Sequence, residues 1–149
     1  MVRWRRLTLK DTNENARITL VSKRRQGDES DEINFDTLGG YYQRDGKFYI
    51  TYSEHKDMGM GDSRVVLKIE PESVTMRRMG DFGTVMVYKK NEVTEFIYRV
   101  PFGELNLKIK TLEIENELTE TGGKLRFCYD LFAGGDATNN DITITVKTE

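Results

Sequence analysis

The stretch that decides the fold is LGGYYQRDGKFYITYSE, residues 38–54. Two runs rich in tyrosine and phenylalanine flank Asp45-Gly46, the dipeptide that best tolerates positive φ at both centres of a two-residue hairpin turn. Such a turn pairs Tyr41 with Ile50, and the alternation of a strand then sorts the side chains between two faces. One face carries Tyr41, Phe48, Ile50 and Tyr52, and the other carries Arg44, Lys47, Tyr49 and Thr51. The stretch therefore predicts an antiparallel hairpin with a core side and a water side.

The same alternation recurs on both sides of this hairpin. Expected strands cover residues 16–25, 33–44, 47–54, 64–70, 73–78, 84–88, 93–100, 105–114, 124–133 and 142–146. The phase slips near Thr111, which predicts a β-bulge or bend, while Pro71 and Pro101 occupy type I turn positions. We interpret QGDESDE (26–32) as a flexible polar link and GGDATNN (134–140) as a turn region.

No segment has a helical period over the length that a typical helix needs. The pattern therefore predicts an all-β, antiparallel up-and-down meander of about 8–10 strands that closes into a barrel, because closure removes exposed strand edges. A sandwich is the alternative. We assign residues 16–149 to the barrel domain and residues 1–15 to an N-terminal arm or extra strand.

Composition narrows the class of protein. The chain has 149 residues, enough for one domain with a real core, and a net charge of −2 from 23 basic and 25 acidic residues. This balance argues against nucleic-acid binding driven by charge. No apolar run is long enough to cross a bilayer, and the basic N-terminus lacks a secretory signal. With Cys128 as its single cysteine, the chain forms no internal disulfide, and we expect a cytoplasmic location.

Several sequence motifs of this chain resemble those of a known family. GGYYQRDGKFYITYSE, LKIEPESVTMRRMG, the PFG turn and TETGGKLRFCYDL follow one another in the order and spacing of the YwiB-like family. These are small bacterial proteins with a domain of unknown function, grouped with the calycins. The resemblance covers roughly residues 16–147 and implies a lipocalin-like (calycin) β-barrel. It implies no activity and no catalytic residues.

Residues that could carry chemistry are sparse. His55 is the only histidine, Cys128 lies in the middle of a predicted strand, and no GxSxG elbow exists. A metal site from His55, Asp57 and Asp62 would have too few suitable ligands, so polar loop residues are the better interpretation. Gly59 and Gly61 lack the third glycine and the helix of a dinucleotide fingerprint. We therefore expect no enzyme, no metal and no cofactor.

Two charged patterns have structural explanations. Glu113, Glu115 and Glu117 alternate along a strand, as on the solvated outside of a barrel. Basic residues occur at Arg3, Arg5 and Arg6 and again at Lys23, Arg24 and Arg25. The acidic DESDE run directly follows the second group, which argues against a basic nucleic-acid surface.

The inward-facing aromatic and polar residues carry the strongest functional signal. Arg78 is in phase with Val74 and Met76, and a buried guanidinium needs a carboxylate or a ligand anion as its partner. The predicted ligand-binding set, on the barrel interior, is Tyr41, Phe48, Tyr52, Arg78, Phe96, Tyr98, Phe127 and Tyr129. The alternative is that these side chains simply fill the core, since a barrel of about eight strands can be closed by side chains alone.

Two functional hypotheses follow. The first is a barrel that binds a small apolar or amphipathic ligand, whose anionic end Arg78 could meet. The second is a non-enzymatic interaction module that has a filled core and meets a protein partner through its outer face or an open edge. A cavity of about 300 Å³ or more favours the first hypothesis. A core filled by Phe48, Tyr52, Tyr98 and Tyr129 excludes it. Oligomeric state is left open.

Overall fold

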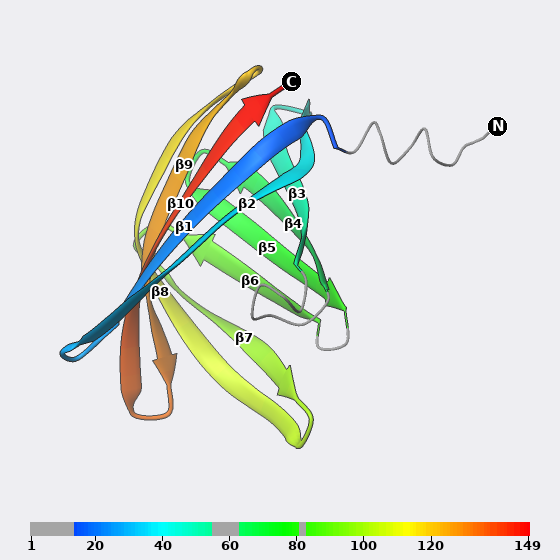
Figure 1. Ribbon diagram of the computed structural model, residues 1–149. Coiled ribbons are helices and arrows are strands. Elements are labelled where there is room, and N and C mark those ends of the chain that lie inside the picture. The colour runs from blue at the N-terminus through cyan, green and yellow to red at the C-terminus, as the bar shows by residue number, and fades with distance from the viewer. Residues whose placement is uncertain (1–13, 55–62, 81–82) are drawn as a thin grey trace.

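The computed structural model describes residues 14–54, 63–80 and 83–149, which form ten antiparallel strands (Figure 1). The strands are β1 (Ala16–Gln26), β2 (Glu29–Arg44), β3 (Lys47–Glu54), β4 (Ser63–Glu70), β5 (Ser73–Gly80), β6 (Thr84–Lys89), β7 (Val93–Val100), β8 (Gly103–Thr119), β9 (Gly122–Ala133) and β10 (Asp136–Thr148). Within these ranges there is no helix, and therefore none that is long and apolar enough to cross a membrane.

The strands form one sheet in the order β6-β5-β4-β3-β2-β1-β10-β9-β8-β7, in which each neighbour is antiparallel. The first and last strands pair along their length, from Ala16 opposite Thr148 to Arg25 opposite Asn139. The sheet curls until β6 and β7 meet (Figure 1). The predicted up-and-down barrel is confirmed, and it is nearly closed.

The seam, which we define as the line where β6 meets β7, is held mainly by side chains. Thr84 Oγ1 donates a hydrogen bond to the Ile97 carbonyl at 3.1 Å, and Thr94 Oγ1 donates to the Val87 carbonyl. Arg99 Nη1 donates to the Gly83 carbonyl at 3.2 Å. The described strands show no backbone ladder at this seam, unlike every other pair of neighbouring strands in the sheet.

The central hairpin has the expected geometry. Asp45 and Gly46 have φ of 54° and 79°, and Tyr41 pairs with Ile50 across β2 and β3. Both residues of the turn have a left-handed backbone conformation, as a type I′ turn requires. The predicted bulge is also confirmed, because the register of β8 against β9 shifts between Thr111 and Glu113.

Two stretches expected as loops are strands, so these predictions were wrong. QGDESDE lies in the β1–β2 hairpin, which turns at Gly27 (φ 60°) and Asp28 and pairs Gln26 with Glu29. The acidic run is ordered because it lies opposite the basic run, and Arg24 contacts Asp31 at 2.9 Å. GGDATNN turns only at Gly134 and Gly135, and β10 begins at Asp136. Polar composition marked these segments as exposed, but exposed side chains are compatible with a paired backbone.

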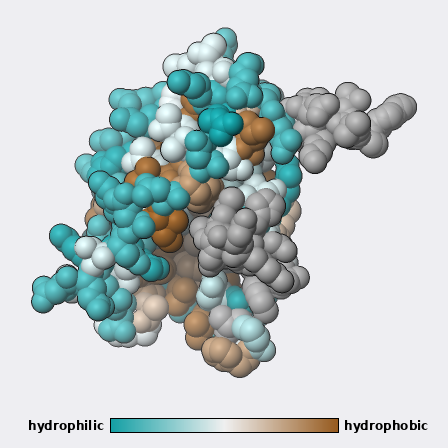
Figure 2. Space-filling model, in the orientation of Figure 1, coloured by the Kyte–Doolittle hydropathy of each residue, from teal (hydrophilic) through white to brown (hydrophobic). Residues whose placement is uncertain are grey.

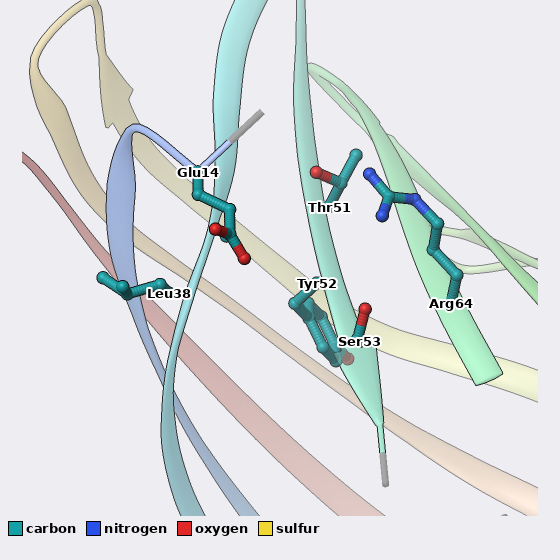
Figure 3. Close-up of a pocket in the computed structure, with 7 residues that line it drawn as sticks. Glu14, Leu38, Thr51, Tyr52, Ser53 and Arg64 are labelled. Carbon is teal, nitrogen blue, oxygen red and sulfur yellow. The ribbon is translucent and has the colours of Figure 1, made fainter. Parts of the chain in front are cut away.

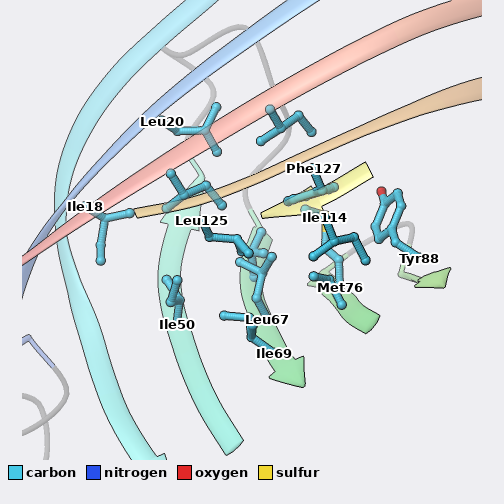
Figure 4. Close-up of a cluster of buried hydrophobic side chains, with 14 of the residues drawn as sticks. Ile18, Leu20, Ile50, Leu67, Ile69, Met76, Tyr88, Ile114, Leu125 and Phe127 are labelled. Carbon is cyan, nitrogen blue, oxygen red and sulfur yellow. The ribbon is translucent and has the colours of Figure 1, made fainter. Parts of the chain in front are cut away.

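The hydrophobic core fills one end of the barrel. Inward side chains there interlock across facing walls, and Figure 4 shows them projecting from β1, β3, β4, β9 and neighbouring strands. The fully buried side chains include Ile18, Ile50, Leu67, Ile69, Ile109, Leu125, Phe127 and Ile144. Tyr41 closes this end, since its hydroxyl donates to the Thr119 carbonyl and its backbone binds the Asn15 side chain. The opposite end, which we call the open end, is where the β1–β2, β7–β8 and β9–β10 turns lie.

Candidate ligand-binding cavity

A cavity of about 430 Å³ occupies the open end of the barrel interior. Nine strands contribute side chains to it, most of them from the strand halves nearer the open end. On the side shown in Figure 2, a hollow with hydrophobic surface lies between hydrophilic atoms, beside the β7–β8 hairpin. The lining residues are Leu20, Ser22, Arg24, Ile33, Phe35, Tyr52, Glu54, Met76, Arg78, Met86, Tyr88, Phe96, Tyr98, Leu107, Tyr129, Leu131, Asn140 and Ile142.

The wall of the cavity is mostly apolar, with a polar group on one side. Met76 and Met86 pair across β5 and β6, and thioether side chains adapt to ligands of different shape. Phe35 packs against Tyr52 with ring centroids 5.6 Å apart. The mixture of apolar surface and a few polar side chains is typical of small-molecule sites.

Glu54 and Arg78 form an ion pair in this wall. Arg78 Nε and Nη2 bind Glu54 Oε1 and Oε2 at 2.8 and 3.1 Å, and Ser63 Oγ donates to Oε1 at 2.8 Å. The Glu54 side chain is 3% exposed and that of Arg78 is 29% exposed. Burial lowers the pKa of Arg78, but the hydrogen bonds and charge of Glu54 outweigh burial and raise it above its ordinary value. The Arg78 charge is therefore retained and lies against the Glu54 carboxylate.

Three buried tyrosines add hydroxyl groups to the lining. The rings of Tyr88 and Tyr129 are tilted with centroids 4.7 Å apart, and the Tyr88 hydroxyl contacts Met86 Sδ at 3.5 Å. Burial raises the pKa of Tyr52, and the Glu54 charge adds to the shift. Burial also raises the pKa of Tyr129. The pKa of Tyr88 is raised well above its ordinary value by burial and, in addition, by the neighbouring Tyr129. All three phenols therefore keep their protons at neutral pH and can donate hydrogen bonds.

The structure separates the predicted interior residues into two groups. Those that line the cavity are Tyr52, Arg78, Phe96, Tyr98 and Tyr129. Those that do not are Tyr41, Phe48 and Phe127: Tyr41 stacks on Phe48 at the closed end with centroids 5.8 Å apart, and Phe127 is fully buried against Tyr88. All three face inward or pack on the core, but they lie at the wrong height in the barrel to reach the cavity.

Sequence reasoning missed Glu54 and Tyr88. Glu54 continues the inward phase of Ile50 and Tyr52, and Tyr88 has the inward phase of Thr84. The signal was therefore present as simple alternation. Glu54 was passed over because a carboxylate on a core face is unusual without a partner, and that partner, Arg78, lies two strands away across β4.

A second hollow, of about 380 Å³, lies on the outer surface beside β2, β3 and β4. Figure 3 shows Glu14, Thr51, Ser53 and Arg64 around it, with Leu38 at its edge. Its lining comes from Glu14 and from β2, β3 and β4 alone, whereas nine strands surround the interior cavity. We therefore regard the interior cavity as the candidate site.

The remaining sequence candidates lie away from the cavity or outside the described residues. Cys128 points outward between inward neighbours, and burial raises its pKa, which disfavours the thiolate. Glu113, Glu115 and Glu117 are exposed on the outer face, as expected, and the first two contact Arg126. His55, Asp57, Gly59, Gly61, Asp62 and the arm residues Arg3, Arg5 and Arg6 lie outside the described ranges. In those ranges no three His, Cys, Asp or Glu side chains are grouped to hold a metal ion.

Comparisons with known proteins agree with this architecture. The chain is 30% identical over 116 residues to the Uncharacterized beta-barrel protein YwiB of Bacillus subtilis (strain 168). The aligned region covers 77% of this chain and 80% of that protein. The crystal structure of the ywiB protein from Bacillus subtilis superposes with a TM-score of 0.81 at 25% identity, over 95% of this chain and 98% of that one. The family model described as Domain of unknown function (DUF1934) matches residues 18–145. The chain therefore belongs to this family of β-barrel proteins.

Proposed function

We propose that this protein binds a small apolar or amphipathic molecule inside the open end of its barrel. The observation that carries the proposal is the interior cavity of about 430 Å³, lined by apolar side chains and a cluster of tyrosine hydroxyls. This volume exceeds the threshold of about 300 Å³ that separates a ligand cavity from a filled core. Use of the interior would also fit the lipocalin-like grouping that the sequence resemblance implies.

In this proposal the protein binds its ligand and does not catalyse a reaction. The lining includes an ion pair and neutral phenols, and the Glu54 carboxylate that Ser63 Oγ contacts is bound through both of its oxygens by Arg78, which disfavours its action as a base. Cys128, which is on the outer side of β9, does not reach this space. With one cysteine the chain suits a reducing compartment, so we place the binding function in the cytoplasm.

Native mass spectrometry of protein purified gently from its own cells tests the proposal. We expect a small molecule to remain bound to the wild-type protein and to be lost from Leu131→Trp, whose larger side chain fills the cavity from a half-buried position. Val85→Trp is the matched control, because Val85 is 41% exposed on the outside of β6. A wild-type protein that carries no ligand and gains no thermal stability from any small apolar compound would contradict the proposal.

The exposed β7–β8 hairpin favours the alternative, a protein-interaction module. Phe102 at its tip is 86% exposed, and the paired residues Tyr98 and Leu105 are 41% and 45% exposed. Exposed apolar groups of this kind often mark contact surfaces. The same native mass spectra discriminate the two functions, since a retained protein of defined mass, lost in Phe102→Ser, would support the interaction module.

A further inference from the structure

We infer that the cavity selects an uncharged amphiphile, one with an apolar body and a polar end that accepts hydrogen bonds. This inference rests on the binding function proposed above and defines the chemical class of its ligand. It also differs from the expectation that Arg78 meets an anionic group of the ligand.

The charged side chains of the lining are paired within the protein. The charged side chains among the described lining residues are Arg24, Glu54 and Arg78. Arg78 is held by both oxygens of Glu54, at 2.8 and 3.1 Å. Arg24 is held by both oxygens of Asp31, at 2.9 and 3.3 Å. Each charged side chain among the described lining residues thus has its partner within the protein, and none of these residues leaves a counter-charge for a ligand.

A charged ligand group would be costly to place in this cavity. A charged ligand group entering this space loses water, and only an opposite charge can offset that loss. A carboxylate that approached Arg78 would lie beside Glu54 and be repelled by it. An ammonium that approached Glu54 would meet the guanidinium in the same way. Either ion is therefore disfavoured against a neutral group of the same size.

The lining supplies hydrogen-bond donors to a neutral polar group. Tyr52 is 3% exposed and lines the cavity as a protonated phenol, because burial raises its pKa. Tyr88 and Tyr129 place two more phenols side by side in the lining, and the Tyr88 hydroxyl donates to the weak acceptor Met86 Sδ at 3.5 Å. Because these groups are protonated donors, a hydroxyl, carbonyl, amide or ether oxygen is the polar end that they best satisfy.

Competition between matched ligands tests the inference. The neutral fluorescent dye N-phenyl-1-naphthylamine is bound to the full-length protein, then displaced by 1-decanol, decanoate or decylammonium below their aggregation limits. These compounds share a chain and differ in the charge of the polar end. We expect 1-decanol to displace the dye at a concentration at least about tenfold lower than either ion. Equal or stronger displacement by decanoate or decylammonium would overturn the inference while leaving the binding function intact. Failure of the dye and of all three compounds to bind would overturn both.

A charge-removal variant tests the cause. Glu54→Gln keeps the shape of the side chain but leaves the Arg78 charge uncompensated, so we expect the preference to shift toward decanoate by about tenfold or more. Glu113→Gln removes the same charge from the outer face, where Glu113 contacts Arg126 at 3.2 Å, and should leave the preference unchanged. An unchanged preference in a folded Glu54→Gln variant contradicts the mechanism. If that variant does not fold, the wild-type comparison of the three ligands still decides the inference.

Discussion

At the scale of single residues, Gly46 has a conformational role that can be measured alone. Its φ is +79°, and a Cβ atom built there meets nothing within 4 Å. We therefore expect Gly46→Val to lower the free energy of unfolding by about 1–2 kcal/mol, entirely from backbone strain, because a β-branched residue resists the left-handed region. Urea denaturation measures this loss. Gly46→Asn is the control and should lose less than half as much, since asparagine tolerates this conformation; equal losses would contradict the assignment.

The Glu54–Arg78 pair predicts a second residue-scale effect. Glu54→Ala leaves a partly buried guanidinium without its carboxylate, so we expect a loss of about 3 kcal/mol in the free energy of unfolding. Glu54→Leu combined with Arg78→Met removes both charges and should recover most of that loss. Glu113→Ala, at an exposed ion pair, should change stability by less than about 0.5 kcal/mol. If the Glu54→Leu/Arg78→Met variant were no more stable than Glu54→Ala, the loss in Glu54→Ala would not come from the unpaired Arg78 charge.

Alternation along the strands predicted which residues face inward, and it did so correctly for Tyr52, Arg78 and Tyr129. It could not predict how high in the barrel each residue lies. Phe127 and Tyr129 share one face of β9, yet the first is packed and the second borders the cavity. That difference depends on the tilt and stagger of the strands, which no local pattern contains.

At the scale of elements, β8 and β9 approach each other closely near their shared turn. A Cβ atom on Gly123 would lie 2.2 Å from the Glu117 carbonyl oxygen, and φ there is +139°. Gly123→Ala should therefore cost at least about 2 kcal/mol, because backbone in a paired strand has little room to shift. Gly135→Ala, at a turn with nothing within 4 Å, is the control and should change stability by less than about 0.5 kcal/mol. Thermal melts of the two variants check this, and similar shifts in both would contradict it.

The ends of strands could be predicted from the sequence where apolar residues alternate with polar ones. The prediction failed where both faces of the strand are polar. The strands with apolar phase, such as β4 and β9, were found within one or two residues. The β1–β2 hairpin was cut short because its outer half carries charges on both faces. The pairing of Arg24 with Asp31 holds those residues in the sheet, and such a contact is visible only after the register is known.

At the scale of the whole molecule, the buried tyrosines make stability depend on alkaline pH. Burial raises the pKa of Tyr41 to about 12 and also raises the pKa values of Tyr52, Tyr88 and Tyr129. In the unfolded chain these phenols ionise near pH 10. Above that pH the unfolded state binds fewer protons than the folded state, so the free energy of unfolding falls as pH rises.

We expect this fall to begin near pH 10 and to accompany the appearance of tyrosinate absorbance. Tyr41→Phe loses the hydrogen bond to the Thr119 carbonyl, about 1 kcal/mol at neutral pH, but makes the alkaline fall less steep. Denaturant melts at several pH values measure both effects. A fall equally steep in Tyr41→Phe would assign the alkaline sensitivity to other groups.

Closure of the sheet into a barrel was predicted from strand number and from the hazard of open edges. The sequence did not predict that one end would be filled and the other hollow. Filling the open end would have required larger side chains at lining positions such as Ser22 and Asn140. Whether the interior is filled there depends on the side chains of all the lining strands together, and no single stretch of sequence contains that information.

The ladder between β1 and β10 has a consequence for how the chain folds. Ala16 pairs with Thr148, so this join brings together residues separated by nearly the whole sequence, which makes it the step with the largest loop-closure entropy. A circular permutant, with Glu149 joined to Met1 and new ends opened between Lys90 and Asn91, would convert that distant pairing into a neighbouring one. It would also leave the β6–β7 join, which has no backbone ladder among the described strands, as the last contact to form. Such a permutant should refold faster than the natural chain.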